Sequence, residues 1–174
     1  NNPIRSPQNV AHNLAQMGFA DIDDSQVLTS AEATAQWLAA RKPGFRYFAV
    51  GGEGLHEALV RKGVADRELA DYVVVGEGPG LDYASLTTGI NLLLEQGALL
   101  VSTNPDATVD ATRDGRRIVL PGGGALVAPF EIATGRKAIV IGKPQPLLFE
   151  MAMQRLGARP ADCIMIGDRP DTDI

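Results

Sequence analysis

Short apolar runs alternate along this chain with longer stretches in which apolar residues recur at helical spacing, and this alternation strongly constrains the fold. Several of the runs end at a glycine or an acidic residue, which is typical of strands buried on both faces of a parallel sheet. The runs lie at residues 47–50, 72–75, 98–102, 137–142 and 163–168. Strands that alternate with helices predict an α/β fold with right-handed crossover connections.

The stretches between the runs carry helix start and stop signals. Ser6 is a predicted N-cap for a first helix, which Gly18 ends. Thr29 or Ser30 caps a second helix in the same way. Two more helices are predicted, at residues 83–96 and 145–156.

Two polar, glycine-bearing segments suggest how the chain is divided. RKPGFR near residues 41–46 and ATGRK near 133–137 flank a compact middle block. We therefore expect an α/β module at residues 43–136, inserted into a sheet domain formed by residues 1–42 and 137–174.

Composition excludes several classes of protein. The net charge of −5 argues against nucleic acid or an anionic membrane as the main partner, because both require a basic surface. No run approaches the ~20 apolar residues that span a bilayer. The single Cys163 excludes an intrachain disulfide framework. The opening NNPIRSP lacks the charged and apolar regions of a signal peptide, so we expect a cytoplasmic protein.

The closing stretch GDRPDTDI places Asp168, Asp171 and Asp173 directly after an apolar run. Ligands of open α/β sheets bind beyond the carboxyl ends of the strands, and a carboxylate there is a natural ligand for Mg²⁺. The alternative is that Asp168 and Asp173 are turn and N-cap residues of a following helix. These residues alone leave both interpretations open.

Lys143 follows another apolar run, behind Gly142, so it is expected at the same edge of the sheet as Asp168. An ammonium group in that place can neutralise a phosphoryl group. A solvated lysine in a loop is the commoner case for a lone residue. The opposite charges of Lys143 and Asp168 at one edge favour the functional interpretation.

Asparagine side chains supply weaker candidates. Asn1 and Asn2 precede the first predicted helix, whose N-terminus can bind an anion, although asparagine is also ordinary in turns. Asn104 lies after a predicted strand, either in a turn or in contact with a substrate. The glycine-rich turns VGGEGL and LPGGGAL lack the Lys-Ser/Thr of a nucleotide-binding loop, and such turns are more often steric than functional.

The GKP motif, followed by an apolar run and GDRPDTDI, resembles the haloacid-dehalogenase-like (HAD) phosphatases, in particular the NagD-like, p-nitrophenylphosphatase-type subgroup with a large α/β cap. NNPIRSP, TSAEATAQWL and STNPD…LPGGGAL are similar to further stretches of that subgroup. The resemblance implies a Rossmann-like parallel-sheet core, here incomplete, with an inserted cap. It also implies a small phosphorylated metabolite as substrate, Mg²⁺ as cofactor, and a possible homodimer through the cap.

The resemblance also implies a role for each matching residue. Lys143 would be the catalytic lysine that binds the transferred phosphoryl group, Asp168 the Mg²⁺ ligand, and Asp173 the acidic partner behind it. The remaining implied substrate contacts are Asn1, Asn2, Asn104, Arg169, Pro170, Asp171 and Thr172.

One family feature has no counterpart in these residues. The family's nucleophile belongs to an Asp-x-Asp motif after a strand, whereas Asp21 and Asp23 follow a helical pattern and are rejected for that role. We therefore expect the nucleophile before Asn1 and the 174 residues alone to be inactive. A non-catalytic binding module, and a phosphoryl mutase or phosphonatase on the same scaffold, are the alternatives.

Overall fold

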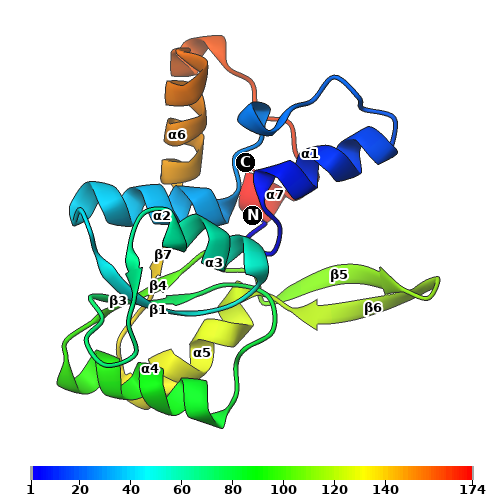
Figure 1. The fold of residues 1–174 in the computed structure, drawn as a ribbon. Helices are drawn as coiled ribbons and strands as arrows, with labels where there is room; N and C mark the ends of the chain where they lie inside the picture. The colour runs from blue at the N-terminus through cyan, green and yellow to red at the C-terminus, as the bar shows by residue number, and fades with distance from the viewer. Residues whose placement is uncertain (1, 174) are drawn as a thin grey trace.

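The computed structural model describes residues 2–173 and is built around a parallel sheet of five strands in the order β2-β1-β3-β4-β7 (Figure 1). The strands of this sheet are β1 (Arg46–Val50), β2 (Val64–Ala65), β3 (Tyr72–Val75), β4 (Leu99–Ser102) and β7 (Ile139–Val140). The α-helices are α1 (Pro7–Gln16), α2 (Ser30–Arg41), α3 (Glu53–Val60), α4 (Tyr83–Glu95), α5 (Gly123–Thr134), α6 (Pro146–Leu156) and α7 (Pro170–Asp173). Two short 3₁₀ helices, η1 (Asp24–Gln26) and η2 (Pro160–Asp162), complete these elements. The predicted α/β class is confirmed.

Helices cover both faces of the sheet, as Figure 1 shows with α2 and α3 on one side and α4 and α5 on the other. Alternate strand residues point to opposite faces, so Val74 packs with the α2 and α3 core while Val73 packs with the α4 and α5 core. The central strand β3 is buried along its whole length, which explains its unbroken Tyr-Val-Val-Val sequence.

The predicted helix caps at the N-terminal side are confirmed. Ser6 Oγ accepts a hydrogen bond from the Asn9 amide at 3.4 Å, and Thr29 Oγ1 accepts one from the Glu32 amide at 3.1 Å. Both satisfy amides that a helix N-terminus leaves without an internal partner. The Thr29 cap fixes the start of α2, the helix whose alanines pack against the sheet.

A hairpin of β5 (Thr108–Arg113) and β6 (Arg116–Pro121) forms a separate antiparallel sheet and projects from the body of the molecule (Figure 1). Asp114 and Gly115 turn the chain with φ angles of 51° and 72°. This pair of left-handed residues is the backbone that a two-residue hairpin turn requires.

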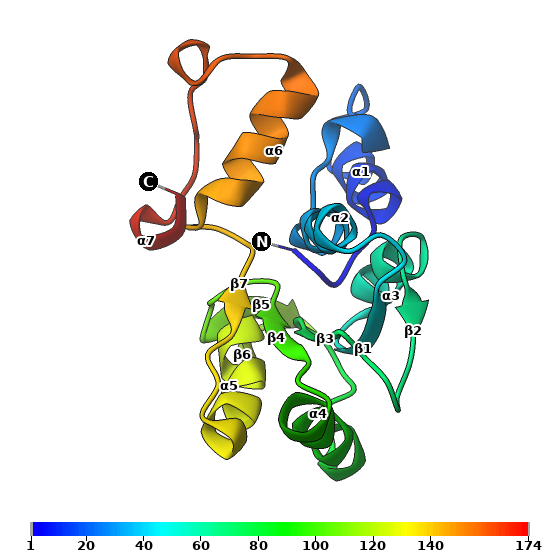
Figure 2. The same cartoon turned by 90° about the vertical axis from the view of Figure 1, so that its left-hand side faces the viewer.

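The expected strand at residues 163–168 is wrong. These residues are extended but form no strand, and Ile164 and Ile166 are 90% and 88% exposed. An apolar run becomes a strand only where a neighbouring strand supplies hydrogen-bond partners, and none lies beside this run within residues 2–173. Figure 2 shows α6 and the chain that follows it standing away from the sheet.

The expected strand at 137–142 is shorter than predicted, because only Ile139 and Val140 pair with β4. Through this pairing β7 extends the sheet that contains β1, β3 and β4. Helix α2 packs on the same sheet beside α3. The division at residues 43 and 136 stays a prediction, and the parallel sheet draws on residues from both sides of it.

Across residues 2–173, every helix is too short or too polar to cross a bilayer.

Candidate functional site

One cavity of about 170 Å³ collects charged residues at the carboxyl edge of the parallel sheet. Glu77 lies just after β3, Asp106 after β4 and Lys143 after β7, and these are adjacent strands. Ligands of open α/β sheets bind at this edge. The segment that ends in α7 closes the other side, and its lining residues are Asp168, Arg169, Thr172 and Asp173.

Lys143, which is half-buried, and the buried Asp173 form an ion pair in this cavity. The Asp173 side chain is 3% exposed, and its second oxygen accepts a hydrogen bond from the Arg169 amide at 3.1 Å. The Lys143 ammonium, and after it the Arg169 amide, hold the pKa of the Asp173 carboxyl below its ordinary value. Asp173 therefore stays ionised, and both of its oxygens bind protein groups.

Gly167 is required by the position of Asp173. A Cβ atom on Gly167 would lie 2.3 Å from the Asp173 carboxyl carbon, well inside van der Waals contact. The glycine of GDR thus lets the chain pass directly over the aspartate that binds Lys143.

Asp168 lies next in the chain, is exposed, and lines the cavity. Thr172 is buried in the same wall, while Pro170 begins α7 and is not among the described lining residues. Asn1 and the side chain of Asp171 lie outside the described parts of the structure.

A second ion pair connects the strand edge to the turn before α7. Asp106 binds Arg169 with an oxygen-to-nitrogen distance of 3.2 Å, although these residues are far apart in the sequence. The Asp106 side chain is 8% exposed, so the aspartate is the buried partner of this pair. The pair holds the wall formed by the β4 end against the wall formed by residues 168–173.

Asn104 supports this arrangement from behind the cavity. It is fully buried, its amide nitrogen donates to Glu77 Oε1 at 2.8 Å, and its oxygen accepts from the Asp106 amide at 3.1 Å and the Gly123 amide at 3.2 Å. A substrate in the cavity would therefore meet Asn104 only through Glu77 and Asp106.

Glu77 is a candidate that sequence reasoning missed. It is 5% exposed, and burial raises the pKa of its carboxyl above the ordinary value, opposed by the Asn104 hydrogen bond. The available signal was its place two residues after the buried strand 72–75, the same kind of position that singled out Lys143.

The glycine-rich turn before α5 is steric, as the sequence suggested. Cβ atoms on Gly122 and Gly124 would lie 2.2 Å from the Asp106 carbonyl oxygen and 2.3 Å from that of Pro105. These glycines let α5 begin against the turn that carries Asp106.

The first residues of the chain are held by a different turn. Asn2 is exposed, and its side-chain oxygen accepts hydrogen bonds from the Ile4 and Arg5 amides at 3.0 and 3.2 Å. Asn2 is not among the residues that line the cavity. Gly54 donates to the Ile4 carbonyl at 2.8 Å and has no room for a Cβ beside Arg5, so VGGEGL is also a close approach between chain segments.

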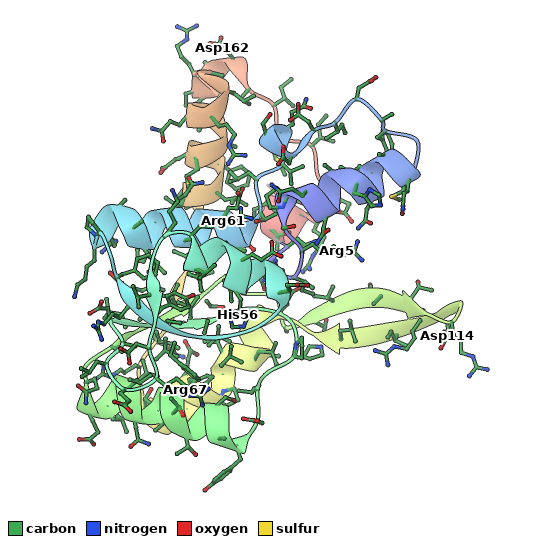
Figure 3. The ribbon with its side chains drawn as sticks, in the orientation of Figure 1. Arg5, His56, Arg61, Arg67, Asp114 and Asp162 are labelled. Carbon is green, nitrogen blue, oxygen red and sulfur yellow. The ribbon has the colours of Figure 1, made fainter. Side chains whose placement is uncertain are left out.

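Figure 3 labels two acidic side chains that are not among the residues lining this cavity. Asp114 lies at the far tip of the hairpin, and Asp162 lies beyond the end of α6. The acidic residues that gather at the sheet edge are thus a local cluster, and they outnumber the two basic residues of the cavity.

Comparison with known proteins bears on this fold and site. A HAD-hydrolase-like family model matches residues 140–174, and a haloacid dehalogenase-like hydrolase model matches residues 1–65. The acid sugar phosphatase of Staphylococcus saprophyticus is 38% identical over 176 residues, covering 100% of this chain and 66% of that protein. The chain thus spans slightly less than two thirds of this curated relative.

Solved structures superpose on nearly the whole chain. A double mutant of the thermostable NPPase from Geobacillus stearothermophilus has a TM-score of 0.91 and 34% identity, covering 99% of this chain and 68% of its own. The glycerol phosphate phosphatase from Mycobacterium tuberculosis in complex with calcium has a TM-score of 0.86 and 34% identity, with coverages of 99% and 51%.

The fold and cavity are those of an α/β protein with an ionic site at the carboxyl edge of its sheet. The chain belongs to the HAD-like hydrolases, in the NagD-like, p-nitrophenyl phosphatase-type subgroup.

Proposed function

We propose that the full-length protein is a Mg²⁺-dependent phosphatase that hydrolyses a small phosphorylated metabolite, a sugar or polyol phosphate, through an aspartyl-phosphate intermediate. The observation that carries the proposal is the single cavity in which Lys143, Asp168 and Asp173 meet. Similarity to an acid sugar phosphatase and to a glycerol phosphate phosphatase supports the substrate class.

Lys143 is the proposed phosphoryl-binding cation. A fixed ammonium group stabilises negative charge that develops on phosphoryl oxygens in the transition state. Asp173 acts as its positioning residue, because the ion pair with this buried carboxylate fixes where the Lys143 nitrogen lies.

The carboxylate of Asp168 is the proposed ligand for a divalent cation, although within residues 2–173 no group of three or more His, Cys, Asp or Glu side chains is placed to hold a metal ion. Lys143 and Arg169 both bind carboxylates of the cavity, so a phosphate dianion would enter an acidic site. Mg²⁺ takes one or two carboxylates together with phosphate oxygens, and the exposed Asp168 is suited to be one of them. When bound, the metal would offset the charge of the phosphoryl group. Asp173 would remain behind it, since its oxygens bind Lys143 and the Arg169 amide.

The nucleophile is proposed to lie outside the described residues. In the implied reaction a carboxylate oxygen bonds to phosphorus as the ester bond to the alcohol breaks, and water then releases phosphate. Within residues 2–173 no Asp-x-Asp pair follows a strand, because Asp21 and Asp23 precede η1 in a turn and the pair at 171 and 173 belongs to α7. A polypeptide of these 174 residues should therefore not hydrolyse phosphate esters.

The test uses protein expressed from the complete coding sequence. We expect hydrolysis of p-nitrophenyl phosphate and of sugar phosphates with Mg²⁺, and loss of it with a chelator. Lys143→Met should lower kcat by about 10²-fold or more, whereas Lys137→Met, at an exposed lysine paired with Glu131, should change it less than about twofold. Equal activity of the two variants would exclude the proposed role of Lys143.

The same assay applied to residues 1–174 alone separates the proposal from its alternative. Turnover by this polypeptide would show that the attacking group lies within it. Absence of turnover by the full-length protein on every phosphate ester would favour a non-catalytic binding module, for which the predicted cap-mediated homodimer is the first state to examine.

A further inference from the structure

A second cavity, of about 330 Å³, lies between the loop after β3 and the hairpin β5–β6. Pro79, Leu120 and Val109 contribute apolar surface, Glu77 lines one part of it, and Arg113 lines another. A volume at the low end of the ~300–1,000 Å³ that is usual for ligand sites suits a compact molecule.

The hairpin presents one face to this cavity. Val109 pairs with Leu120 across the two strands, and both line the cavity and are partly buried. Val119 is the next residue along β6, so its side chain points to the opposite face, where it is 61% exposed. On that outer face Asp110 and Arg117 form an ion pair at 3.0 Å.

Glu77 and Val109 line both this cavity and the one that holds Lys143 and Asp168. The two cavities therefore share Glu77 and Val109 in their walls. A phosphate ester bound with its phosphoryl group near Lys143 would direct its alcohol past Glu77 and toward Leu120.

The Glu77 carboxyl is held in a defined orientation at this junction. Its Oε1 atom accepts the hydrogen bond from Asn104, whose own oxygen is fixed by the Asp106 and Gly123 amides. The carboxyl oxygens of Glu77 can accept a hydrogen bond from a substrate hydroxyl, and burial raises the pKa of this carboxyl, which lessens the cost of placing it beside an anionic phosphoryl group.

We propose that Glu77 is a specificity residue, which binds a hydroxyl of the substrate's alcohol close to the ester oxygen while Leu120 and Pro79 contact the carbon skeleton. This inference rests on the proposed function and narrows it to phosphate esters of compact polyhydroxy alcohols. Such alcohols combine hydroxyls with apolar C–H surface, which matches a cavity where Glu77 and Arg113 lie among otherwise apolar lining residues.

The first test compares glycerol phosphate with propyl phosphate, which lacks the hydroxyls, in the full-length protein. Wild type should prefer glycerol phosphate. Glu77→Leu should reduce that preference in kcat/KM at least about tenfold, because a site built to bind a hydroxyl rejects the analogue without it. Glu77→Gln, which can still accept from Asn104 and bind a hydroxyl, should retain most of the preference.

The outcomes separate this inference from the proposed function. If Glu77→Leu lowers kcat/KM equally for both substrates, or leaves the preference unchanged, Glu77 does not bind the substrate hydroxyl, although the protein is still a phosphatase. If wild type hydrolyses neither ester, nor p-nitrophenyl phosphate, the proposed function fails and the inference with it.

A second test examines the apolar part of the cavity with a matched pair of variants. Leu120→Phe should lower kcat/KM for a hexose 6-phosphate relative to glycerol phosphate by about 10-fold or more. Val119→Phe, on the outer face of the same strand, should leave that ratio within about twofold. Leu120→Ala, which removes side-chain volume at the same place, should not lower that ratio. Equal ratios in all of these folded variants would overturn the assignment of the cavity to the alcohol.

Discussion

The pKa values of two buried carboxyls in this protein are shifted in opposite directions because their neighbours differ. Asp173 is bound by an ammonium group and a backbone amide, which favour its ionised form. Burial is the main influence on Glu77 and raises the pKa of its carboxyl, while the hydrogen bond from the Asn104 amide lowers it. The neighbouring Asp106 further disfavours ionisation of Glu77. One carboxyl thus anchors a cation while the other is suited to bind neutral hydroxyls.

The Glu77 environment predicts a pH dependence of stability. Its raised pKa means that the folded state binds this proton more tightly than the unfolded state, so the free energy of unfolding falls as pH rises from the ordinary value of 4.5 through the folded pKa. Glu77→Gln removes that proton equilibrium.

We therefore expect the stability of Glu77→Gln relative to wild type to increase with pH over this window, measured by urea denaturation at a series of pH values. Asp173→Asn is the control of opposite sign. The lowered pKa of Asp173 stabilises the fold above 3.8, and that contribution is lost as pH falls through the folded pKa. A pH-independent difference for Glu77→Gln would contradict the burial argument.

At the scale of elements, the start of α5 is governed by contact with the turn after β4. Helix propensity favours alanine over glycine by up to about 1 kcal/mol. At Gly124, however, a Cβ would meet the Pro105 carbonyl at 2.3 Å. The steric clash should outweigh the gain in helix propensity, because the obstructing atom belongs to the backbone.

Gly124→Ala should accordingly lower the free energy of unfolding by about 1–3 kcal/mol, despite its better helix propensity. Ala125→Gly, at the next and exposed position of the same helix turn, should cost only about 0.5–1 kcal/mol. Urea denaturation of both variants measures these values. A stabilised Gly124→Ala protein would show that α5 is free to shift away from the turn.

At the scale of the whole molecule, Arg155 connects the last long helix to the first part of the chain. Its guanidinium donates to the Ser25 carbonyl at 3.1 Å and the Val27 carbonyl at 2.8 Å, and it also approaches Glu32 at 3.5 Å. Helix α6 otherwise meets the rest of the structure mainly through α2.

Arg155→Ala should lower the free energy of unfolding by about 1–3 kcal/mol, because it removes charge-assisted hydrogen bonds to carbonyls. Arg159→Ala, which removes an exposed pair with Asp162, should cost less than about 1 kcal/mol. Chemical denaturation of the two variants provides the comparison, and equal losses would mean that Arg155 does not join the two parts.

The same contrast between local and distant contacts explains which features were predictable. The strands at 47–50 and 72–75 were evident because short apolar runs of aromatic and β-branched residues are typical of strands buried on both faces of a sheet. The run at 163–168 is also apolar over Ile164, Met165 and Ile166, yet these side chains are exposed. Composition cannot tell whether a partner strand is within reach.

By itself, the sequence determined the α/β class and the helix cap at Ser6, narrowed the second cap to Thr29 or Ser30, and singled out Lys143, Asp168 and Asp173 as candidate site residues, because these depend on local pattern and side-chain chemistry. Tertiary structure alone decided that Arg169 binds Asp106, that Asn104 stands behind Glu77, and that Glu77 lies between two cavities. Those contacts join segments distant in the chain, and their geometry arises only when neighbouring strands bring their carboxyl ends to one edge.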